Sequence, residues 1–107
     1  MGDLDDLAER MKFGFATESQ RNEFARQTLL LAGARVNVLL KAPLEDRQDV
    51  TSDTVGRALA TICSWNRFKG AWSTFVAVCA RSAVRDWNIR HKRHQAVLEA
   101  LRKGDND

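Results

Sequence analysis

Apolar side chains recur at steps of three and four residues along most of this chain, which is the spacing of a helix that buries one face. Only one proline, Pro43, and six glycines interrupt the pattern, and no segment alternates apolar and polar residues as a half-buried strand does. A length of 107 residues suits one domain with one core. The sequence therefore predicts an all-α protein, a bundle of three or four helices around leucine, valine, phenylalanine and tryptophan side chains.

Two helices are expected before the proline. The first, Asp3–Met11, has an acidic first turn and ends at Gly14, so residues 1–16 form a short N-terminal helix. The second covers about 17–41, with Thr17 or Ser19 as its cap, and the proline that follows stops it. Its core-facing stripe is Phe24, Thr28, Leu31, Ala32, Arg35, Val36 and Leu39.

Two further helices are expected after the proline. Residues 43–50 are polar and predict a connection, and the third helix then starts at Thr51 or Ser52 as its cap. A glycine inside that helix, Gly56, predicts the close approach of another helix. After a break at 66–70, the fourth and longest helix opens near Ser73. The apolar face of the third helix is Val55, Leu59, Ile62 and Cys63.

The end of the fourth helix carries a second apolar stripe. It follows Trp87 and a basic stretch, and it packs either on the core of the domain or on a partner helix. Residues 104–107, which include Gly104, are expected to form a disordered tail. The stripe consists of Ala96, Val97, Ala100 and Leu101.

Charge is distributed unevenly between the two halves of the chain. Residues 1–53 hold seven Lys and Arg against ten Asp and Glu, whereas residues 54–107 hold ten against four. Within 81–94 there are five basic residues, two histidines and one acid, Asp86, which is expected to pair with Arg90 one helical turn away. A basic segment of this kind either binds a polyanion or forms a solvated helix face.

Several classes of chemistry find no support in the sequence. Cys63 and Cys79 lie in apolar helical patterns and are expected to be buried free thiols. His91 and His94 have a spacing that suits a metal, but no carboxylate or thiol stands near them, so we expect neither a metal nor a cofactor. No catalytic constellation is apparent, and an enzyme is the least favoured class. The acidic start and the absence of a bilayer-length apolar run predict a cytoplasmic protein without membrane contact.

Two motifs in the second half resemble region 2 of bacterial RNA polymerase sigma factors. One is Gly70-Ala71-Trp72-Ser73-Thr74-Phe75, a glycine-x-aromatic-Ser-Thr-aromatic turn. The other is the Ala-Arg-Ser-x-x-x-Asp-x-x-x-Arg run at 80–93, which is closest to the extracytoplasmic-function group. The resemblance extends over about 29–94 and implies that residues 17–103 form a helical domain of the region 2 type. It implies a transcription factor that binds the polymerase clamp and the −10 promoter element.

The resemblance also implies two binding faces. One face, at the start of the third helix, would contact the positively charged coiled coil of the clamp in the largest polymerase subunit through salt-screened polar contacts. The polymerase-binding residues would then be Asp49, Ser52, Asp53 and Arg57, although the first three would equally serve as helix caps. The other face, on the fourth helix, would position DNA through its phosphates. The DNA-binding residues would be Arg81, Ser82, Arg85, Arg90, Lys92 and Arg93.

The chain departs from the family pattern in two ways. Primary sigma factors resemble one another in a tryptophan pair that wedges the duplex open. In this chain Val78 and Cys79 stand at the matching positions. The extracytoplasmic-function group also generally lacks the pair, so this departure is compatible with that group. Trp72, Phe75 and Trp87 are expected to be core residues rather than stacking platforms. No helix-turn-helix for the −35 element follows, which predicts part of a split sigma factor with a second subunit, or a phage- or plasmid-type regulator. An inhibitor that competes with the host sigma factor, and a non-specific helical DNA-binding protein without polymerase contact, are the alternatives.

Overall fold

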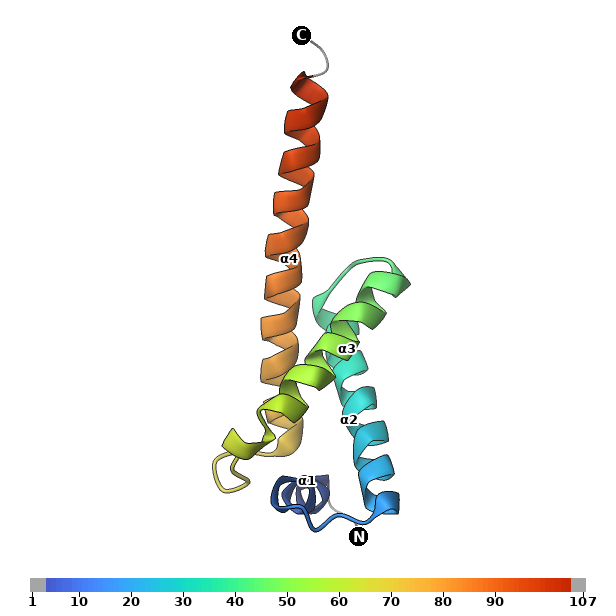
Figure 1. Cartoon of the computed structure of the whole chain (residues 1–107), viewed down its shortest axis with the longest axis vertical. Coiled ribbons are helices and arrows are strands. Elements are labelled where there is room, and N and C mark those ends of the chain that lie inside the picture. Colours follow the sequence, from blue (N-terminus) through green and yellow to red (C-terminus); the bar gives the residue numbers. More distant parts are fainter. Residues whose placement is uncertain (1–3, 105–107) are drawn as a thin grey trace.

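Four α-helices and one short 3₁₀ turn make up residues 4–104, which are the residues that the computed structural model describes, and no strand occurs among them. Helices α2, α3 and α4 pack pairwise against one another, and α1 lies across one end of this bundle (Figure 1). The predicted all-α fold is confirmed. The elements are α1 (Leu4–Phe13), α2 (Glu18–Leu39), α3 (Leu44–Ala60), the 3₁₀ turn η1 (Ile62–Ser64) and α4 (Trp72–Gly104).

The junction between α1 and α2 follows from its sequence. Gly14 ends α1 in the left-handed region with a φ of 77°, a conformation that costs glycine little. Thr17 then caps α2: its hydroxyl accepts a hydrogen bond from the Gln20 N–H, and the Gln20 side chain accepts one from the Thr17 N–H. This reciprocal pair satisfies two backbone donors at the helix start. The first two helices therefore form as predicted, except that Asp3 lies outside the described residues.

The buried face of α2 is narrower than the predicted stripe. Leu31 is half-buried, whereas Arg35 and Leu39 are exposed, so the prediction that these last two face the core is wrong. A stripe that repeats every fourth residue leaves positions 35 and 39 at its edge, where the helix meets solvent. The fully buried residues of α2 are Phe24, Thr28, Ala32 and Val36.

The start of α3 differs from the prediction. Residues 44–50 are helical rather than a connection, and Pro43 occupies the N-cap position with a φ of −55°. A proline both ends the preceding helix and suits a helix start, because its fixed φ is helical and it has no N–H to satisfy. Glu45 and Asp46 stabilise the first turn through the helix dipole, and Val50 is buried.

The core at the α1 end is built around Trp72, which has no exposed surface. Its ring lies 5.2 Å from the ring of Phe24 and stacks at 5.2 Å on Phe75, and Trp65 meets it edge-on at 5.6 Å. The Trp72 indole N–H donates a hydrogen bond of 3.0 Å to the buried Thr28 hydroxyl. The prediction that Trp72 belongs to the core is confirmed.

The contact between α2 and α3 corrects two predictions. Gly56 is exposed, and no heavy atom lies within 4 Å of the place that a Cβ would take there, so it does not mark a helix crossing. Gly33 of α2 marks the close approach of the two helices, because Thr51 Cγ2 of α3 lies 3.8 Å from the place that a Cβ of Gly33 would take. The buried residues of α3 are Val50, Thr54 and Ala58, while Val55 and Ile62 are half-buried and the predicted core residues Leu59 and Cys63 are exposed. The buried stripe of α3 is the one that packs against α2 and α4.

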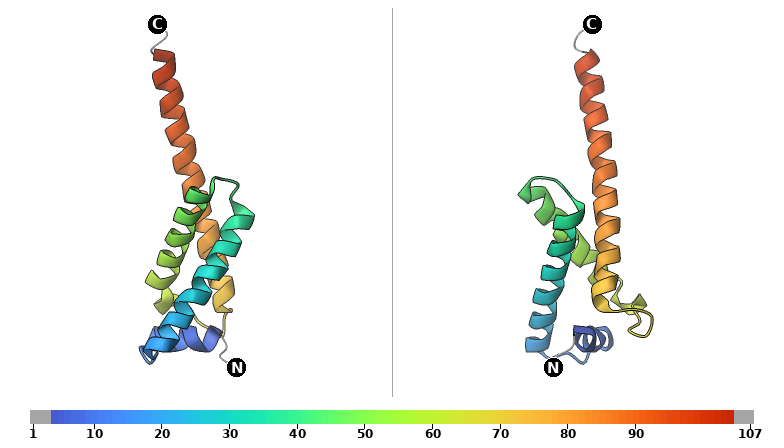
Figure 2. Two further views of the ribbon diagram at one scale, coloured as in Figure 1. Left: turned by 90° about the vertical axis from the view of Figure 1, so that its right-hand side faces the viewer. Right: turned by 180° about the vertical axis from the view of Figure 1, so that it is seen from behind.

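Helix α4 extends well beyond the bundle, and the described chain measures 65 × 24 × 21 Å (Figures 1 and 2). Trp87 is half-buried, and every residue from 88 to 104 is exposed. The second apolar stripe therefore does not pack on the domain's own core. Gly104, expected in the tail, is the last helical residue, and residues 105–107 lie outside the described chain. Within residues 4–104, no helix combines the length and the hydropathy that a bilayer span requires.

Candidate nucleic-acid interface

A basic groove runs along α4 next to the end of α2. Arg81 and Arg85 are exposed and lie one turn apart, and Lys92 continues the row two turns further on. With Leu39 of α2 these side chains line a hollow of about 320 Å³. The remaining lining residues are Val84, Asn88 and Ile89. Three of the six predicted DNA-binding residues are therefore brought together.

The other three predicted DNA-binding residues lie elsewhere on α4. Arg90 and Arg93 line a separate hollow with Arg57 and Asp86, on the side of α4 that faces α3. Ser82 is half-buried, and its hydroxyl accepts a hydrogen bond of 3.1 Å from the Arg57 guanidinium. The predicted set is thus divided over two faces, and Ser82 serves the contact between two helices.

Arg57 links α3 to α4 through two carboxylates. Its guanidinium lies 3.1 Å from the carboxylate of Asp53 on its own helix and 2.8 Å from that of Asp86 on α4. The hydrogen bonds that the guanidinium donates to these carboxylates, that to Asp53 first, raise the pKa of Arg57 above its usual value. The ion pair that the structure gives Asp86 is therefore with Arg57, not with Arg90 as predicted. The residues predicted to bind polymerase and those predicted to bind DNA meet at this guanidinium.

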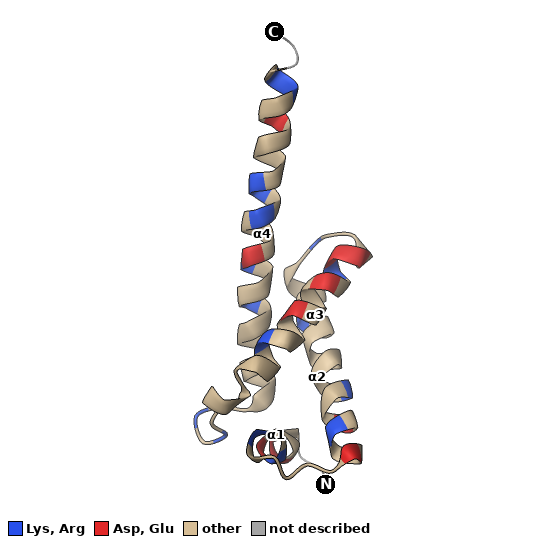
Figure 3. Ribbon diagram, in the orientation of Figure 1, with Lys and Arg blue, Asp and Glu red and all other residues tan. Residues whose placement is uncertain are grey.

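An acidic face follows the outer side of α3. Asp49 and Ser52 are exposed and Asp53 is half-buried, and all three lie inside the helix, so the alternative that they cap it is wrong. Glu45 is exposed one turn before Asp49 and extends the same face. It was missed because residues 43–50 were predicted to be a connection. Figure 3 shows the acidic residues along the first part of α3 and the basic residues along α4.

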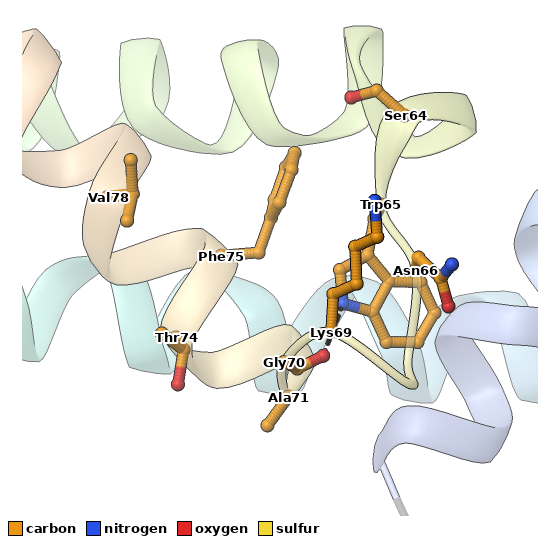
Figure 4. A pocket seen from close by; sticks show the side chains of 9 residues that line it. All are labelled: Ser64, Trp65, Asn66, Lys69, Gly70, Ala71, Thr74, Phe75 and Val78. Carbon is orange, nitrogen blue, oxygen red and sulfur yellow. Dashed lines mark hydrogen bonds between the residues drawn. The ribbon is translucent and has the colours of Figure 1, made fainter.

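A small apolar pocket lies where the loop after η1 meets the start of α4. Its volume is about 230 Å³, and Figure 4 shows Phe75 and Val78 of α4 on one side with Trp65, Asn66 and Lys69 of the loop on the other. The Trp65 indole N–H donates a hydrogen bond of 3.0 Å to the Gly70 carbonyl, which closes the loop just before α4 begins. The other lining residues are Ser64, Gly70, Ala71 and Thr74.

Phe68 lies in the same loop and is 91% exposed, although it is a large apolar side chain. Its neighbour Arg67 holds the loop on α1, with 2.7 Å ion pairs to Asp6 and Glu9. The pocket and the exposed Phe68 were not among the predicted features. The signal was an aromatic residue inside the polar break at 66–70.

The remaining predicted features of α4 have mixed outcomes. Val78 is half exposed, and Cys79 is half-buried. Both cysteines are free, but the prediction that both are buried is wrong for Cys63, which is exposed within η1. Phe75 and Trp87 are only partly buried, and Trp87 stacks at 4.6 Å on His91. No cluster of three or more His, Cys, Asp or Glu side chains suited to a metal ion occurs among residues 4–104.

These features make the described chain a helical bundle with an acidic face on α3, a basic groove on α4 and an aromatic pocket at the start of α4. No protein-family model, curated protein sequence or solved structure matches the chain.

Proposed function

We propose that the protein is a transcription initiation or regulatory factor of the sigma-region-2 type, which binds the RNA polymerase clamp through α3 and −10 promoter DNA through α4. The observation that carries the proposal is the basic groove. Arg81, Arg85 and Lys92 are exposed on one side of α4, and none of them forms an ion pair within the described residues. Cations in such a row are available for an external polyanion.

The groove has the dimensions of a short stretch of nucleic acid. Residues 81 and 92 are eleven positions apart, which corresponds to about 16 Å along a helix. One DNA strand rises about 3.4 Å per nucleotide, so the row covers about five nucleotides. Phosphate contacts from Arg81, Arg85 and Lys92 position a strand without reading its sequence.

The aromatic pocket supports a second kind of contact. Phe75 of α4 exposes part of its ring in the pocket. Phe68 and Lys69 lie in the loop before α4, and Lys69 provides a positive charge at the rim of the pocket. An unpaired base stacks on aromatic rings of this kind, and the stacking tolerates any base. A strand held in the groove and a base held in the pocket would both lie along the first half of α4. This arrangement suits an opened promoter element better than an intact duplex.

The acidic face of α3 supports the polymerase contact. Glu45, Asp49 and Ser52 are exposed and follow one side of the helix, where they complement a positively charged coiled coil. Arg57 joins α3 to α4 and so fixes this face relative to the basic groove. A fixed relation between the two faces is what a protein needs if it is to hold DNA beside the polymerase. The proposal implies a cytoplasmic location.

The test of the polymerase contact is a pull-down with the isolated clamp coiled coil of the largest polymerase subunit. Asp49→Arg should abolish retention, because it reverses the charge at the centre of the acidic face. Glu18→Arg makes the same change of net charge at an exposed position of α2 and should leave retention unchanged. The proposal is refuted if the coiled coil retains neither the natural chain nor the control variant.

A second candidate is favoured by one observation. The two positions that match the wedge tryptophans of primary sigma factors hold Val78 and Cys79, neither of which is aromatic. A chain that binds polymerase but cannot wedge DNA open would inhibit transcription by competing with the host sigma factor. In vitro transcription separates the two: added chain with core polymerase alone yields transcript only if it acts as an initiation factor, whereas a competitor only reduces transcription by the host sigma factor.

A further inference from the structure

One stripe of α4 keeps a seven-residue repeat from the bundle into the projecting part of the helix, with six apolar residues and two histidines at its first and fourth positions. Its first positions, Ala77, Ala80 and Val84, are buried against the neighbouring helices. Its last two, Leu98 and Leu101, are 52% and 62% exposed. The full repeat is Ala77, Val84, His91 and Leu98 at its first position, and Ala80, Trp87, His94 and Leu101 at its fourth.

Such a repeat is the pattern of a helix that packs lengthwise on another helix. The bundle already uses it in this way up to Trp87, which packs near the turn from α2 to α3 (Figures 1 and 2). Residues 88–104 continue it for about 25 Å with nothing against it. The Trp87 and His91 rings stack at 4.6 Å across the boundary, so the stripe is continuous there. The exposed half is therefore an extension of an existing helix-packing surface.

The charges along the projecting part decide what kind of helix fits it. Residues 88–104 hold five Lys and Arg and a single acid, Glu99, which lies off the stripe. Arg90 and Arg102 stand at the positions that flank the stripe, on opposite sides. A second copy of the same segment would bring five more cations to the contact and no carboxylate to either of these flanking arginines. An acidic helix would place carboxylates there.

We propose that the exposed stripe of α4 beyond Trp87 is the docking site for an amphipathic helix of a different protein, with apolar residues that meet Leu98 and Leu101 and acidic residues that meet Arg90 and Arg102. This inference does not rest on the proposed function. Beyond Trp87 the repeat consists of His91, His94, Leu98 and Leu101, none of which lines the basic groove. Leucines half exposed on a helix give a DNA backbone nothing to bind, but they give a partner helix an apolar surface.

The experiment uses the full chain and a synthetic peptide of three heptads with leucine at the two core positions and glutamate at the flanking positions. Its like charges keep this peptide from pairing with itself. Titration calorimetry should show saturable binding of one peptide per chain. A matched peptide with lysine at the flanking positions should bind at least about tenfold more weakly. Equal binding of the two peptides, or no binding of the glutamate peptide, would overturn the proposal.

Two variants test the site on the chain. Leu98→Ser with Leu101→Ser should weaken binding of the glutamate peptide at least about tenfold, because each leucine loses its apolar contact. Ala96→Ser with Ala100→Ser changes the same segment outside the seven-residue repeat and should leave the affinity unchanged. Neither variant should shift the thermal midpoint of the bundle, since all four residues are exposed. An equal loss in both variants would show that binding does not use the stripe.

Charge reversal tests the flanks separately. Arg90→Glu with Arg102→Glu should invert the preference, so that the lysine peptide binds more tightly than the glutamate peptide. Arg93→Glu with Lys103→Glu makes the same change of net charge off the stripe and should keep the original preference. Two results would overturn the choice of occupant: self-association of the natural chain in sedimentation that the leucine variant abolishes, or a tenfold loss of DNA affinity in that same variant.

Discussion

The Arg57 guanidinium of α3 and the Asp86 carboxylate of α4 lie 2.8 Å apart and join the helix that carries the acidic face to the helix that carries the basic groove. Asp53 and Ser82 complete the contact, one on each helix. The Arg57 side chain is about one-third exposed. Water therefore partly screens the ion pairs of Arg57. These ion pairs fix the acidic face relative to the basic groove as well as stabilising the fold.

Replacing Arg57 should weaken the domain moderately. Arg57→Met keeps part of the aliphatic stem but leaves Asp53 and Asp86 without their shared cation. We expect a loss of about 1 kcal/mol, at the upper end for a partly exposed pair because several groups share one guanidinium. For a domain of this size the thermal midpoint would fall by about 4–8 °C. High salt should reduce the difference from the natural chain, and a difference that salt does not change would contradict the electrostatic account.

Trp72 should be the side chain on which stability depends most. Trp72→Ala removes a fully buried ring that contacts Phe24, Trp65 and Phe75, and should cost about 3–5 kcal/mol. Trp72→Phe retains much of the packing but leaves the Thr28 hydroxyl without its donor, at about 1–3 kcal/mol. Phe68→Ala, at an exposed aromatic, should change the free energy of unfolding by no more than about 0.5 kcal/mol. Urea denaturation of the three variants measures this order.

The fold was largely predictable because its signals are local. The capping box of Thr17 and Gln20 and the glycine at 14 act within one turn of the chain. The start of α3 was missed because a proline after a helix and before an acidic stretch is compatible with a loop as well as with an N-cap. The burial of Val50 decides between them, and burial depends on how α2 and α3 cross.

The candidate site was less predictable for the same reason. The exposure of Arg81 and Arg85 follows from the periodicity of α4 alone. The roles of Arg57 and Ser82 depend on a partner 25 residues away along the chain, so only the packing of α3 on α4 reveals them. The apolar pocket at Phe75 requires the loop to fold back on α4, which no periodicity describes.

The two cysteines should react with thiol reagents at different rates. Cys63 is exposed, whereas burial raises the pKa of the Cys79 thiol, against the smaller opposing effect of the Arg57 charge. Since the thiolate is the reactive form, Cys79 should react slowly in the folded protein. Mass spectrometry after brief alkylation at neutral pH should show one modified cysteine, identified as Cys63. In urea both should react, and two fast cysteines without urea would contradict the structure.

Glu23 should titrate at unusually low pH. Its hydrogen bond with Arg26, then that with Gln27, lowers the pKa of the carboxyl from 4.5 to about 2. A depressed pKa in the folded state stabilises it above pH 4.5, and this stabilisation disappears as the pH falls toward 2. A carboxyl-detected NMR titration should place Glu23 below the other glutamates. In Arg26→Met its midpoint should return toward 4.5, and an unchanged midpoint would assign the shift to another cause.

The salt dependence of DNA binding tests the basic groove most directly. If Arg81 and Arg85 contact phosphates, Arg81→Ala with Arg85→Ala should weaken duplex binding and reduce the slope of log affinity against log salt by about 0.9 for each lost contact. Arg10→Ala with Arg21→Ala removes two exposed charges from α1 and the start of α2, at the opposite end of α2 from Leu39, and should leave the slope nearly unchanged. Fluorescence anisotropy between about 50 and 200 mM salt measures both. If the slope of log affinity against log salt falls equally in the two variants, the groove is an ordinary solvated helix face and the proposal of DNA binding by α4 fails. The docking of a peptide on Leu98 and Leu101 is a separate proposal and is not affected by that result.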